Sequence, residues 1–357
     1  MPLKDVSALF VSPEATLREV LERSNATRRG IVLVVDQSQR LLGTVTDGDI
    51  RRAMLAGMDL ALRAADFIAA KGAGRPPITA SVAIQHADLV ALVRRTGISQ
   101  IPLLDDDGRV VRVVGLEDLL DEDEQALQAV VMAGGMGTRL QPLTEDLPKP
   151  MLPVGGKPVI EHIIRQLSDT GIRQVSVTTH YLREKIEQHF GDGRDFGVNL
   201  RYLEEESLLG TAGGLSLMAP PQSTLLVING DILTRVDFRA MHSFHREHRA
   251  ALTLAVREYE FQVPYGVVES SGPRVERVVE KPVQKVFVNA GIYLLERAVH
   301  ALIPKGRRFE MTDLIRAAID RGLTVVKFPV WEYWRDIGQP SDYLQAEADA
   351  KSGKWAR

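Results

Sequence analysis

The feature that most constrains this chain is a short apolar run that ends in a glycine-rich loop. Residues 130–133 (VVMA) are typical of a buried parallel strand, and the segment GGMGTR follows at once. The glycines let backbone N–H groups approach an anion closely, and free amides in such a loop bind phosphate. Arg139 adds a planar guanidinium that can contact two phosphate oxygens, and Lys149 adds a second cation. The sequence therefore predicts a strand followed by a polyphosphate-binding loop.

Two better-known glycine loops do not match this one. A P-loop needs Gly-Lys-Ser/Thr, whereas Gly137 is followed by Thr138 and Arg139. The dinucleotide fingerprint needs Gly or Ala at the position that Leu140 occupies. The whole segment GGMGTRLQPLTEDLPKPMLPVGGKP, residues 134–158, closely resembles the signature of the sugar-1-phosphate nucleotidyltransferases.

This resemblance implies roles for the residues of the loop. The nucleotide contacts that it implies here are Ala133, Gly134, Gly135, Gly137 and Thr138. The loop amides and Arg139 would hold the pyrophosphate that leaves, and Lys149 would neutralise the α-phosphate. These two side chains and Asp231 are the catalytic candidates.

Two aspartates are candidates for a metal site. Asp231 ends the string VINGD after an apolar run, and Asp336 lies in WRDIG before the last expected helix. A divalent cation on a triphosphate needs only one or two carboxylates, because phosphates and water supply the other ligands. The resemblance implies that both aspartates bind Mg²⁺, although a lone Asp after a strand is more often a cap or turn residue.

Two further groups of residues complete the expected site by resemblance. The string LLGTAGGL at 208–215 is implied to contact the nucleoside through Gly210, Thr211 and Gly213, and Thr211 is also an expected helix N-cap. A sugar phosphate needs hydrogen-bond acceptors for its hydroxyls and a cation for its phosphate. The implied sugar-phosphate contacts are Gly266, Glu280, Lys281 and Asn289.

Composition limits the classes of protein that this chain can belong to. Its 357 residues suggest two domains, and 44 basic against 47 acidic side chains give a net charge of −3. This balance argues against a general role on nucleic acid or membrane surfaces. The chain has no cysteine, so disulfides and thiolate metal sites are impossible, and we expect a cytoplasmic protein.

The first third of the chain contains an internal repeat. The string GIVLVVD at 30–36 returns as SQIPLLD at 99–105, an offset of 69 positions, and each copy predicts a helix, two short strands and a second helix. The pattern resembles a tandem pair of CBS motifs over residues 1–122. The acidic run 121–124 predicts a linker to a second domain at 126–357.

CBS pairs bind nucleotides between their two motifs, so the resemblance implies ligand contacts at Thr46 and Asp49. Asp118 is a weaker candidate, because Gly115 stands where the first copy has Thr46. A packing or dimerisation unit without ligand is the alternative. If a nucleotide effector binds, we expect it to act on the second domain through a homodimer formed by the CBS pair.

In the second domain, strands alternate with helices, which predicts a doubly wound, mostly parallel α/β sheet after the smaller α+β CBS pair. The resemblance implies nucleotidyl transfer from a nucleoside triphosphate to a sugar-1-phosphate with Mg²⁺. The loop sequences most resemble the guanylyl branch, which includes mannose-1-phosphate guanylyltransferases. The CBS pair ahead of a short transferase resembles glucosamine-1-phosphate guanylyltransferases.

The sequence leaves two alternative functions open. One is uridylyl, thymidylyl or cytidylyl transfer to another sugar-1-phosphate, because no residue in the sequence can be shown to recognise guanine. The other is a nucleotide-sensing regulator whose transferase domain is inactive, although Arg139, Lys149, Asp231 and Asp336 are all present.

Overall fold

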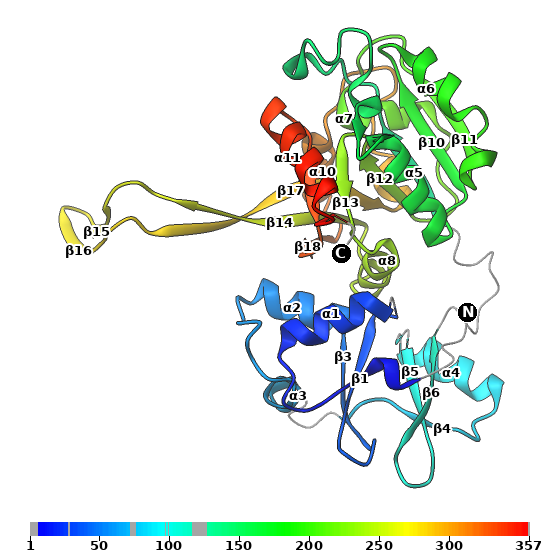
Figure 1. Ribbon diagram of the computed structural model, residues 1–357, viewed down its shortest axis with the longest axis vertical. Coiled ribbons are helices and arrows are strands. Elements are labelled where there is room, and N and C mark those ends of the chain that lie inside the picture. Colours follow the sequence, from blue (N-terminus) through cyan, green and yellow to red (C-terminus); the bar gives the residue numbers. More distant parts are fainter. Residues whose placement is uncertain are drawn as a thin grey trace. The chain divides into compact units, whose positions relative to one another are not determined.

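The structure is a computed structural model that describes residues 6–27, 29–71, 76–96, 98, 100–115 and 127–355 (Figure 1). Contacts divide the chain into two compact units. The first comprises 1–127 with 237–250, and the second comprises 128–236 with 251–357. Asp118 and the acidic run 121–124 lie outside the described residues.

The first unit contains two copies of one supersecondary motif. The elements of the first copy are β1 (Phe10–Val11), α1 (Leu17–Thr27), β2 (Ile31–Val35), β3 (Leu41–Thr46), α2 (Asp47–Leu55) and α3 (Ala64–Lys71). Those of the second are β4 (Ala80–Ser81), α4 (His86–Thr96), β5 (Gln100–Leu104) and β6 (Val110–Gly115). The 69-residue offset of the sequence repeat relates α1 to α4 and β2 to β5, so the expected internal repeat is confirmed in the folded chain.

The two copies need each other to bury apolar surface. Val110 of the second copy packs in one core with Leu9, Ile31, Leu33 and Val35 of the first. An isolated antiparallel bridge between Arg40 and Arg109, which are also 69 positions apart, joins the two hairpins. Each copy alone would leave part of an apolar face in water, which is the reason such motifs occur in pairs.

The second unit is built on a seven-stranded sheet of order β11-β10-β7-β12-β17-β14-β18. Its strands are β7 (Gln128–Met132), β10 (Gln174–Thr179), β11 (Asn199–Glu204), β12 (Leu225–Asn229), β14 (Leu252–Gln262), β17 (Val283–Leu295) and β18 (Val325–Val330). Only β17 runs against its neighbours, so the sheet is mostly parallel, as the sequence predicts.

The helices of this segment of the chain follow the strands in alternation. They are α5 (Val159–Thr170), α6 (Arg183–Phe190), α7 (Gly210–Gly213), α8 (Phe238–Glu247), α9 (Arg297–His300), α10 (Met311–Asp320) and α11 (Pro340–Lys351). By its contacts α8 groups with the first unit. Two short ladders, β8 (Pro153–Val154) with β9 (Lys157–Pro158) and β13 (Ile232–Thr234) with β19 (Trp334–Asp336), complete the body of the second unit. Among the described residues, no helix has the length and apolar character needed to cross a membrane.

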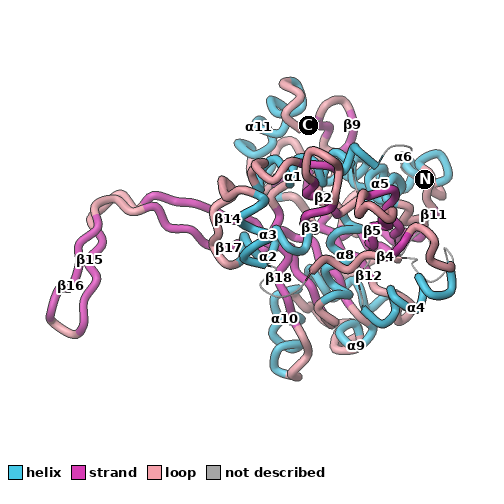
Figure 2. Tube along the Cα trace, turned by 90° about the horizontal axis from the view of Figure 1, so that it is seen from below, coloured by secondary structure: helices cyan, strands magenta, loops and turns pink. Residues whose placement is uncertain are grey.

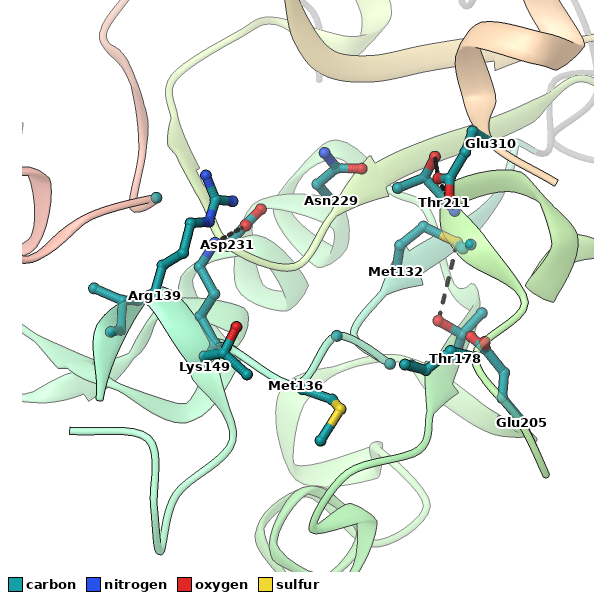
Figure 3. A pocket seen from close by; sticks show the side chains of 18 of the residues that line it. Met132, Met136, Arg139, Lys149, Thr178, Glu205, Thr211, Asn229, Asp231 and Glu310 are labelled. Carbon is teal, nitrogen blue, oxygen red and sulfur yellow. Dashed lines mark hydrogen bonds and ion pairs between the residues drawn. The ribbon is translucent and has the colours of Figure 1, made fainter. Parts of the chain in front are cut away.

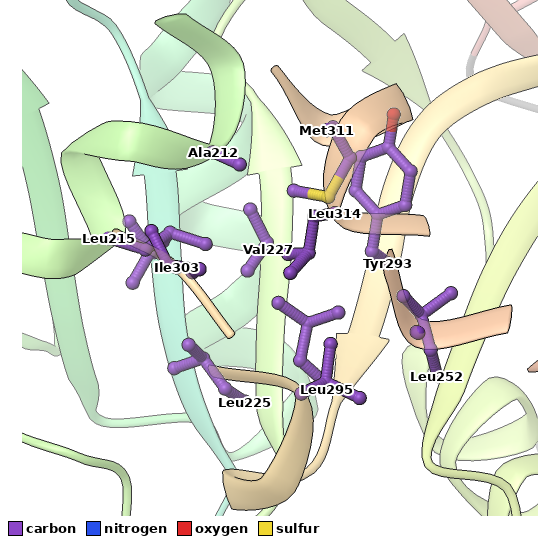
Figure 4. Packing of buried hydrophobic residues seen from close by; sticks show 13 residues of the cluster. Ala212, Leu215, Leu225, Val227, Leu252, Tyr293, Leu295, Ile303, Met311 and Leu314 are labelled. Atoms are coloured by element: carbon purple, nitrogen blue, oxygen red, sulfur yellow. The ribbon is translucent and has the colours of Figure 1, made fainter. Parts of the chain in front are cut away.

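One core cluster holds the central strands against α10 (Figure 4). Leu225 and Val227 of β12 face Leu295 of β17, and Met311 and Leu314 of α10 cover them. All five side chains are buried. Burial of each such side chain contributes about 1.5–3 kcal/mol to folding, so this cluster fixes the strands whose ends carry the site.

Strands β14 and β17 continue beyond the sheet as a two-stranded ribbon, which ends in the hairpin β15 (Val267–Ser271) and β16 (Arg274–Val279) (Figures 1 and 2). We call residues 258–287 the arm. An alternation of strands and helices does not predict such an extension.

Candidate active site

A cavity of about 460 Å³ lies at the carboxyl ends of three parallel strands (Figure 3). Met132, Thr178 and Asn229, at or near the ends of β7, β10 and β12, line it. Ligands of open α/β sheets bind at this edge, because the loops that leave the strands surround it.

The glycine-rich loop forms one wall of the cavity, through Gly134, Gly135, Gly137 and Thr138. Gly137 has φ +65°, and a Cβ there would lie 3.0 Å from the Cβ of Lys149. Only glycine therefore fits where the loop turns into the 3-10 turn Thr138–Leu140. Ala133 is buried, and its N–H donates to the carbonyl of Thr178 at 3.1 Å.

The two expected cations reach the cavity from this side. Arg139 and Lys149 both line it. Lys149 forms an ion pair with Asp231, and the side chains of Lys149 and Asp231 are 11% and 22% exposed. The structure therefore brings together the three residues for which the sequence predicts catalytic roles.

The aspartates of the expected metal site are neighbours. Asp336 on β19 pairs in register with Ile232 on β13, and the N–H of Ile337 donates to the carbonyl of Asp231 at 3.1 Å. Gly230, which precedes Asp231, donates to the carbonyl of Met132, and a Cβ at Gly230 would lie 2.9 Å from that oxygen. The Asn-Gly-Asp turn is thus held tightly against the glycine-loop strand.

Oxygen Oδ1 of Asp231 is buried and has no hydrogen-bond partner in the described part of the chain. Partial burial and the charge of Asp231 raise the pKa of Asp336 to about 6, although Lys149 and Arg139 oppose this shift. An unpartnered buried carboxylate oxygen beside a second carboxylate fits a divalent cation. Among the described residues no group of three or more His, Cys, Asp or Glu side chains gathers, so such a cation would also need phosphate oxygens and water.

The opposite wall differs partly from the expectation. Gly210 and Thr211 line the cavity, whereas Gly213 is buried and packs on the carbonyl of Arg307. Thr211 does not cap its own helix, so the expectation of an N-cap for α7 is wrong. Its hydroxyl instead accepts from the N–H of Met311 at 2.8 Å, at the start of α10.

Three charged residues of this wall were not anticipated. Glu205 is 5% exposed, and burial raises its pKa. Its Oε2 accepts from the N–H of Leu209 at 2.9 Å. Glu310 accepts from both the N–H and the hydroxyl of Thr211, and these bonds lower its pKa. Arg308 also lines the cavity and pairs with Glu310 at 3.0 Å.

Sequence signals for these residues were weak. Glu205 directly follows β11, a strand-end position like that of Asp231, and this signal could have identified it. Arg308 and Glu310 precede α10 and reach the cavity only because α7 packs on the segment 307–310.

The expected sugar-phosphate residues do not lie together in the cavity. Gly266, Glu280 and Lys281 are on the arm, and none of them lines the cavity. Asn289 lies at the base of the arm, and its Oδ1 accepts from the N–H of Gly291. Gly291 in turn packs against the amide of Asn229, so Asn289 is beside the cavity rather than in its wall.

The expected CBS contacts in the first unit already have partners within the unit. Thr46 and Asp49 form a capping box at the start of α2. The Asp49 carboxylate also pairs with Arg52 and Lys71. Burial opposes ionisation of Asp49, but Lys71 and, to a smaller extent, the bonds with Thr46 lower its pKa. Asp118 lies outside the described residues.

Glycine-loop amides and two cations at the carboxyl edge of a mostly parallel sheet, with Asp231 among them, are typical of phosphate-binding α/β proteins. Comparison with known families refines this class. The model described as "Nucleotidyl transferase" matches residues 128–353, and the CBS domain model matches residues 3–56 and 73–124. The chain belongs to the nucleotidyl transferase family and carries two CBS motifs ahead of that domain, which confirms the family resemblance of the sequence.

Individual relatives have names of the same kind. The mannose-1-phosphate guanylyltransferase of Mycobacterium tuberculosis is 36% identical over 236 residues, which are 64% of this chain and 65% of that protein. A UTP–glucose-1-phosphate uridylyltransferase of Synechocystis is 34% identical over 241 residues, 62% of each chain. The chain thus spans less than two thirds of the length of these relatives.

A solved structure from Bacillus anthracis, assigned as a glucose-1-phosphate thymidylyltransferase in complex with sucrose, superposes with a TM-score of 0.52 at 25% identity. The match covers 63% of this chain and 96% of that chain. It supports the α/β fold of the second unit.

Proposed function

We propose that the second unit transfers a nucleotidyl group from a nucleoside triphosphate to a sugar-1-phosphate, with GTP and glucosamine- or mannose-1-phosphate as the inferred pair. An oxygen of the sugar phosphate attacks the α-phosphorus of the nucleotide. A new P–O bond forms while the bond to the β-phosphate oxygen breaks, so the products are a nucleoside diphosphate sugar and pyrophosphate. The attacking oxygen is already anionic at neutral pH, and no general base is needed.

The observation that carries this proposal is the environment of Asp231. Its carboxylate pairs with Lys149, interacts with the charge of Asp336 and lines the same cavity as the glycine-rich loop, and one buried oxygen has no partner among the described residues. The phosphates of a nucleoside triphosphate would accept hydrogen bonds from the loop amides, and the accompanying divalent cation would bind this oxygen.

Each residue then has a defined task in positioning and neutralising charge. The loop amides and Arg139 hold the β- and γ-phosphates, which leave as pyrophosphate. Lys149 moves from Asp231 onto the α-phosphate, where negative charge accumulates. Asp231 and Asp336 would hold Mg²⁺, which when bound neutralises the phosphate oxygens of both substrates.

Glu205 supports guanine among the bases. A carboxylate only accepts hydrogen bonds, and Glu205 has acceptor sites left beyond the bond from Leu209. The Watson–Crick edge of guanine offers two adjacent donors, N1–H and the 2-amino group. On the same edge, uracil, thymine and cytosine have a hydrogen-bond acceptor beside each donor. The buried carboxylate would repel that acceptor, so these bases should bind less well than guanine.

A pyrophosphate-release assay tests the reaction class directly. Five nucleotides (ATP, GTP, CTP, UTP and dTTP) are each combined with mannose-, glucosamine- and glucose-1-phosphate in magnesium. We expect turnover with GTP and one of the first two sugars. Preferred turnover with UTP, dTTP or CTP would favour the other branches, one of which includes the uridylyltransferase named in Synechocystis. No turnover with any pair would favour the inactive sensor.

We further propose that the CBS unit binds a nucleotide that changes the activity of the second unit. The family match supports such binding, whereas the bonds that Asp49 already makes favour a unit that only packs or dimerises. Titration of AMP, ATP, GMP and GTP into the assay distinguishes the two. A saturable change in rate that Thr46→Val weakens supports regulation, and identical rates throughout contradict it.

A further inference from the structure

The arm contains three of the four residues expected to bind the sugar phosphate, and it groups them with one another. Oxygen Oε2 of Glu280 lies 3.0 Å from the position of a Cβ on Gly266. The N–H of Lys281 donates to the carbonyl of Tyr265 at 3.3 Å. Lys281 has φ +46°, a conformation that non-glycine residues rarely adopt and that concentrates at functional positions. The arm thus presents one local cluster of sugar-binding chemistry.

This cluster is far from the cavity of its own chain. The β14–β17 ladder runs without a break from the pair Val256–Asn289 to the pair Gln262–Val283. Six residue steps from Asn289 to Val283 correspond to roughly 20 Å at about 3.3 Å per residue. Glu280 and Lys281 lie beyond that point, and a lysine side chain cannot span the gap. Figures 1 and 2 both show the arm directed away from the sheet.

The direction of the arm is fixed at its base. The guanidinium of Arg257 donates to the carbonyls of Val330 and Glu332, each at 3.0 Å. On the next strand, the Nζ of Lys327 lies 4.4 Å from the ring centre of Phe287. These contacts tie both strands of the ribbon to β18 or to the loop after it, so the ribbon does not hang from a free hinge.

The arm also has two unlike faces. Antiparallel register places Tyr259, Phe261 and Val286 on one face, where they are 56%, 44% and 43% exposed. The other face carries the Lys285 ion pairs with Glu258 and Glu260. A two-stranded ribbon is only marginally stable in water, and an exposed apolar face of this kind indicates a surface that another chain covers.

Within the described ranges, the cavity lacks a free cation for the phosphate of the sugar, and Lys281 on the arm would supply one. Of the cations that line it, Lys149 is paired with Asp231, and Arg308 is paired with Glu310. Arg139 is assigned to the triphosphate, so among the described residues no cation of the cavity wall is left for the phosphate of the sugar. The cavity of a second, identical chain holds the same nucleotide-binding residues and lacks this cluster in the same way.

We propose that two copies of this chain exchange arms, so that Glu280 and Lys281 of each copy enter the nucleotide cavity of the other. The exchange is reciprocal and closes as a two-fold dimer, and the apolar face of each arm packs on its partner. The role of Glu280 and Lys281 in binding sugar phosphate rests on the proposed function. The exchange itself rests on the placement of the arm.

Cross-linking tests the exchange without any assay of activity. The chain has no cysteine, so single introduced thiols react cleanly. Tyr265→Cys places a thiol on the arm, where Tyr265 is 74% exposed, and Ser341→Cys places one in α11, three residues after Gly338 of the cavity wall. The two full-length variants, one of them labelled with ¹⁵N, are coexpressed or mixed and treated with a short bis-maleimide.

We expect a cross-linked dimer whose joined peptides contain positions 265 and 341 from differently labelled chains. Asp169→Cys in place of Ser341→Cys is the matched control, because Asp169 lies in the last turn of α5 at the opposite edge of the sheet. A chain that carries both cysteines reports the alternative, and a 265–341 link found only within single chains of that double variant would overturn the proposal. So would the absence of that link, or equal linkage to position 169.

Complementation tests whether the exchanged arm completes the site. Asp231→Asn inactivates the cavity, and Lys281→Ala lowers the rate by about tenfold when the sugar phosphate is kept far below its KM, so the mixtures are assayed under that condition. Random pairing of the two chains should restore about a quarter of wild-type sites, because only mixed dimers hold one intact cavity with one intact arm. No gain on mixing would show that each arm serves its own chain. If the wild-type protein turns over no substrate, the proposed function fails, while the cross-link still decides the exchange.

Discussion

The cavity and the arm carry motifs of the same family, but the fold treats them differently. In the cavity, residues from 134 to 338 converge because parallel strands end at a common edge. On the arm, Gly266, Glu280 and Lys281 are near each other only because a hairpin pairs them locally. Sequence order alone places both groups in one site, whereas the continuous β14–β17 ladder separates them. The sequence therefore predicts that motifs at the ends of parallel strands share one site, but it does not predict where motifs on an extended ribbon lie relative to that site.

The largest effects should come from the cavity. We expect Arg139→Ala or Asp231→Asn to lower kcat by on the order of 10² to 10³, because each removes a charge that acts on the phosphates in the transition state. Steady-state pyrophosphate release measures the change. Arg201→Ala, at an exposed position on β11, is the matched control and should leave kcat unchanged. Near-normal turnover of Asp231→Asn would remove the cavity from the mechanism.

A smaller effect should come from the arm. We expect Lys281→Ala to raise KM for the sugar phosphate by about tenfold, since a hydrogen bond from a charged group contributes roughly 1.5–3 kcal/mol. Nucleotide affinity, measured by equilibrium binding, should be unchanged. Lys285→Ala on the charged face of the same arm serves as the control. Equal effects of the two variants would mean that the arm acts as a structural element only.

Within the cavity, Glu205 should govern the choice of base rather than the rate. We expect Glu205→Gln to reduce the preference for GTP over UTP by about tenfold, which corresponds to about 1.4 kcal/mol, because a neutral amide can donate to a carbonyl that the carboxylate repels. The ratio of kcat/KM values for the two nucleotides measures this preference. An unchanged ratio would exclude Glu205 as the residue that distinguishes bases.

The smallest effect concerns the pH dependence of stability. The raised pKa of Asp336, about 6, means that the folded state favours the protonated carboxyl. This contribution is complete below the unfolded pKa of 3.8 and is lost as the pH rises through about 6. Above that value the ionised pair with Asp231 destabilises the metal-free protein, by less than about 1 kcal/mol because solvent screens Asp336.

Asp336→Asn should therefore raise the Tm of the metal-free protein at pH 8 and leave it nearly unchanged at pH 4. Thermal unfolding at both values, with and without magnesium, measures this difference. Magnesium should stabilise the wild-type protein at pH 8 more than the variant. A lower Tm of the variant at pH 8 without metal would show that the two carboxylates do not repel each other in the fold.

Several parts of the site could be predicted because their position in the chain implies their position in space. The loop from Gly134 to Arg139 follows a fully apolar run, and Asp231 follows another, so a shared parallel sheet brings them together. The CBS repeat was visible for a similar reason, since copies with one pattern of apolar residues adopt one fold. Asp336 was recognised only by resemblance, and its approach to Asp231 depends on the β13–β19 ladder.

Other parts depended on packing that no local pattern records. Thr211 has the sequence context of an N-cap for α7. Its hydroxyl instead accepts a hydrogen bond from the N–H of Met311, because α10 starts beside it. Position 213 requires glycine, because a Cβ there would lie 2.9 Å from the carbonyl oxygen of Arg307. Arg308 and Glu310 reach the cavity through the same contact.

The sequence by itself determined the family, the two-part organisation, the glycine-rich loop and the residues that follow the parallel strands. These follow from apolar periodicity and backbone freedom, which are local properties of the chain. Only the tertiary structure decided that Glu205 enters the cavity wall, that Asp231 keeps an unpartnered oxygen, and that the sugar-binding cluster stands on an arm. Strand register, helix packing and the length of the β14–β17 ladder decide these positions, because each depends on contacts between residues that are far apart in the chain.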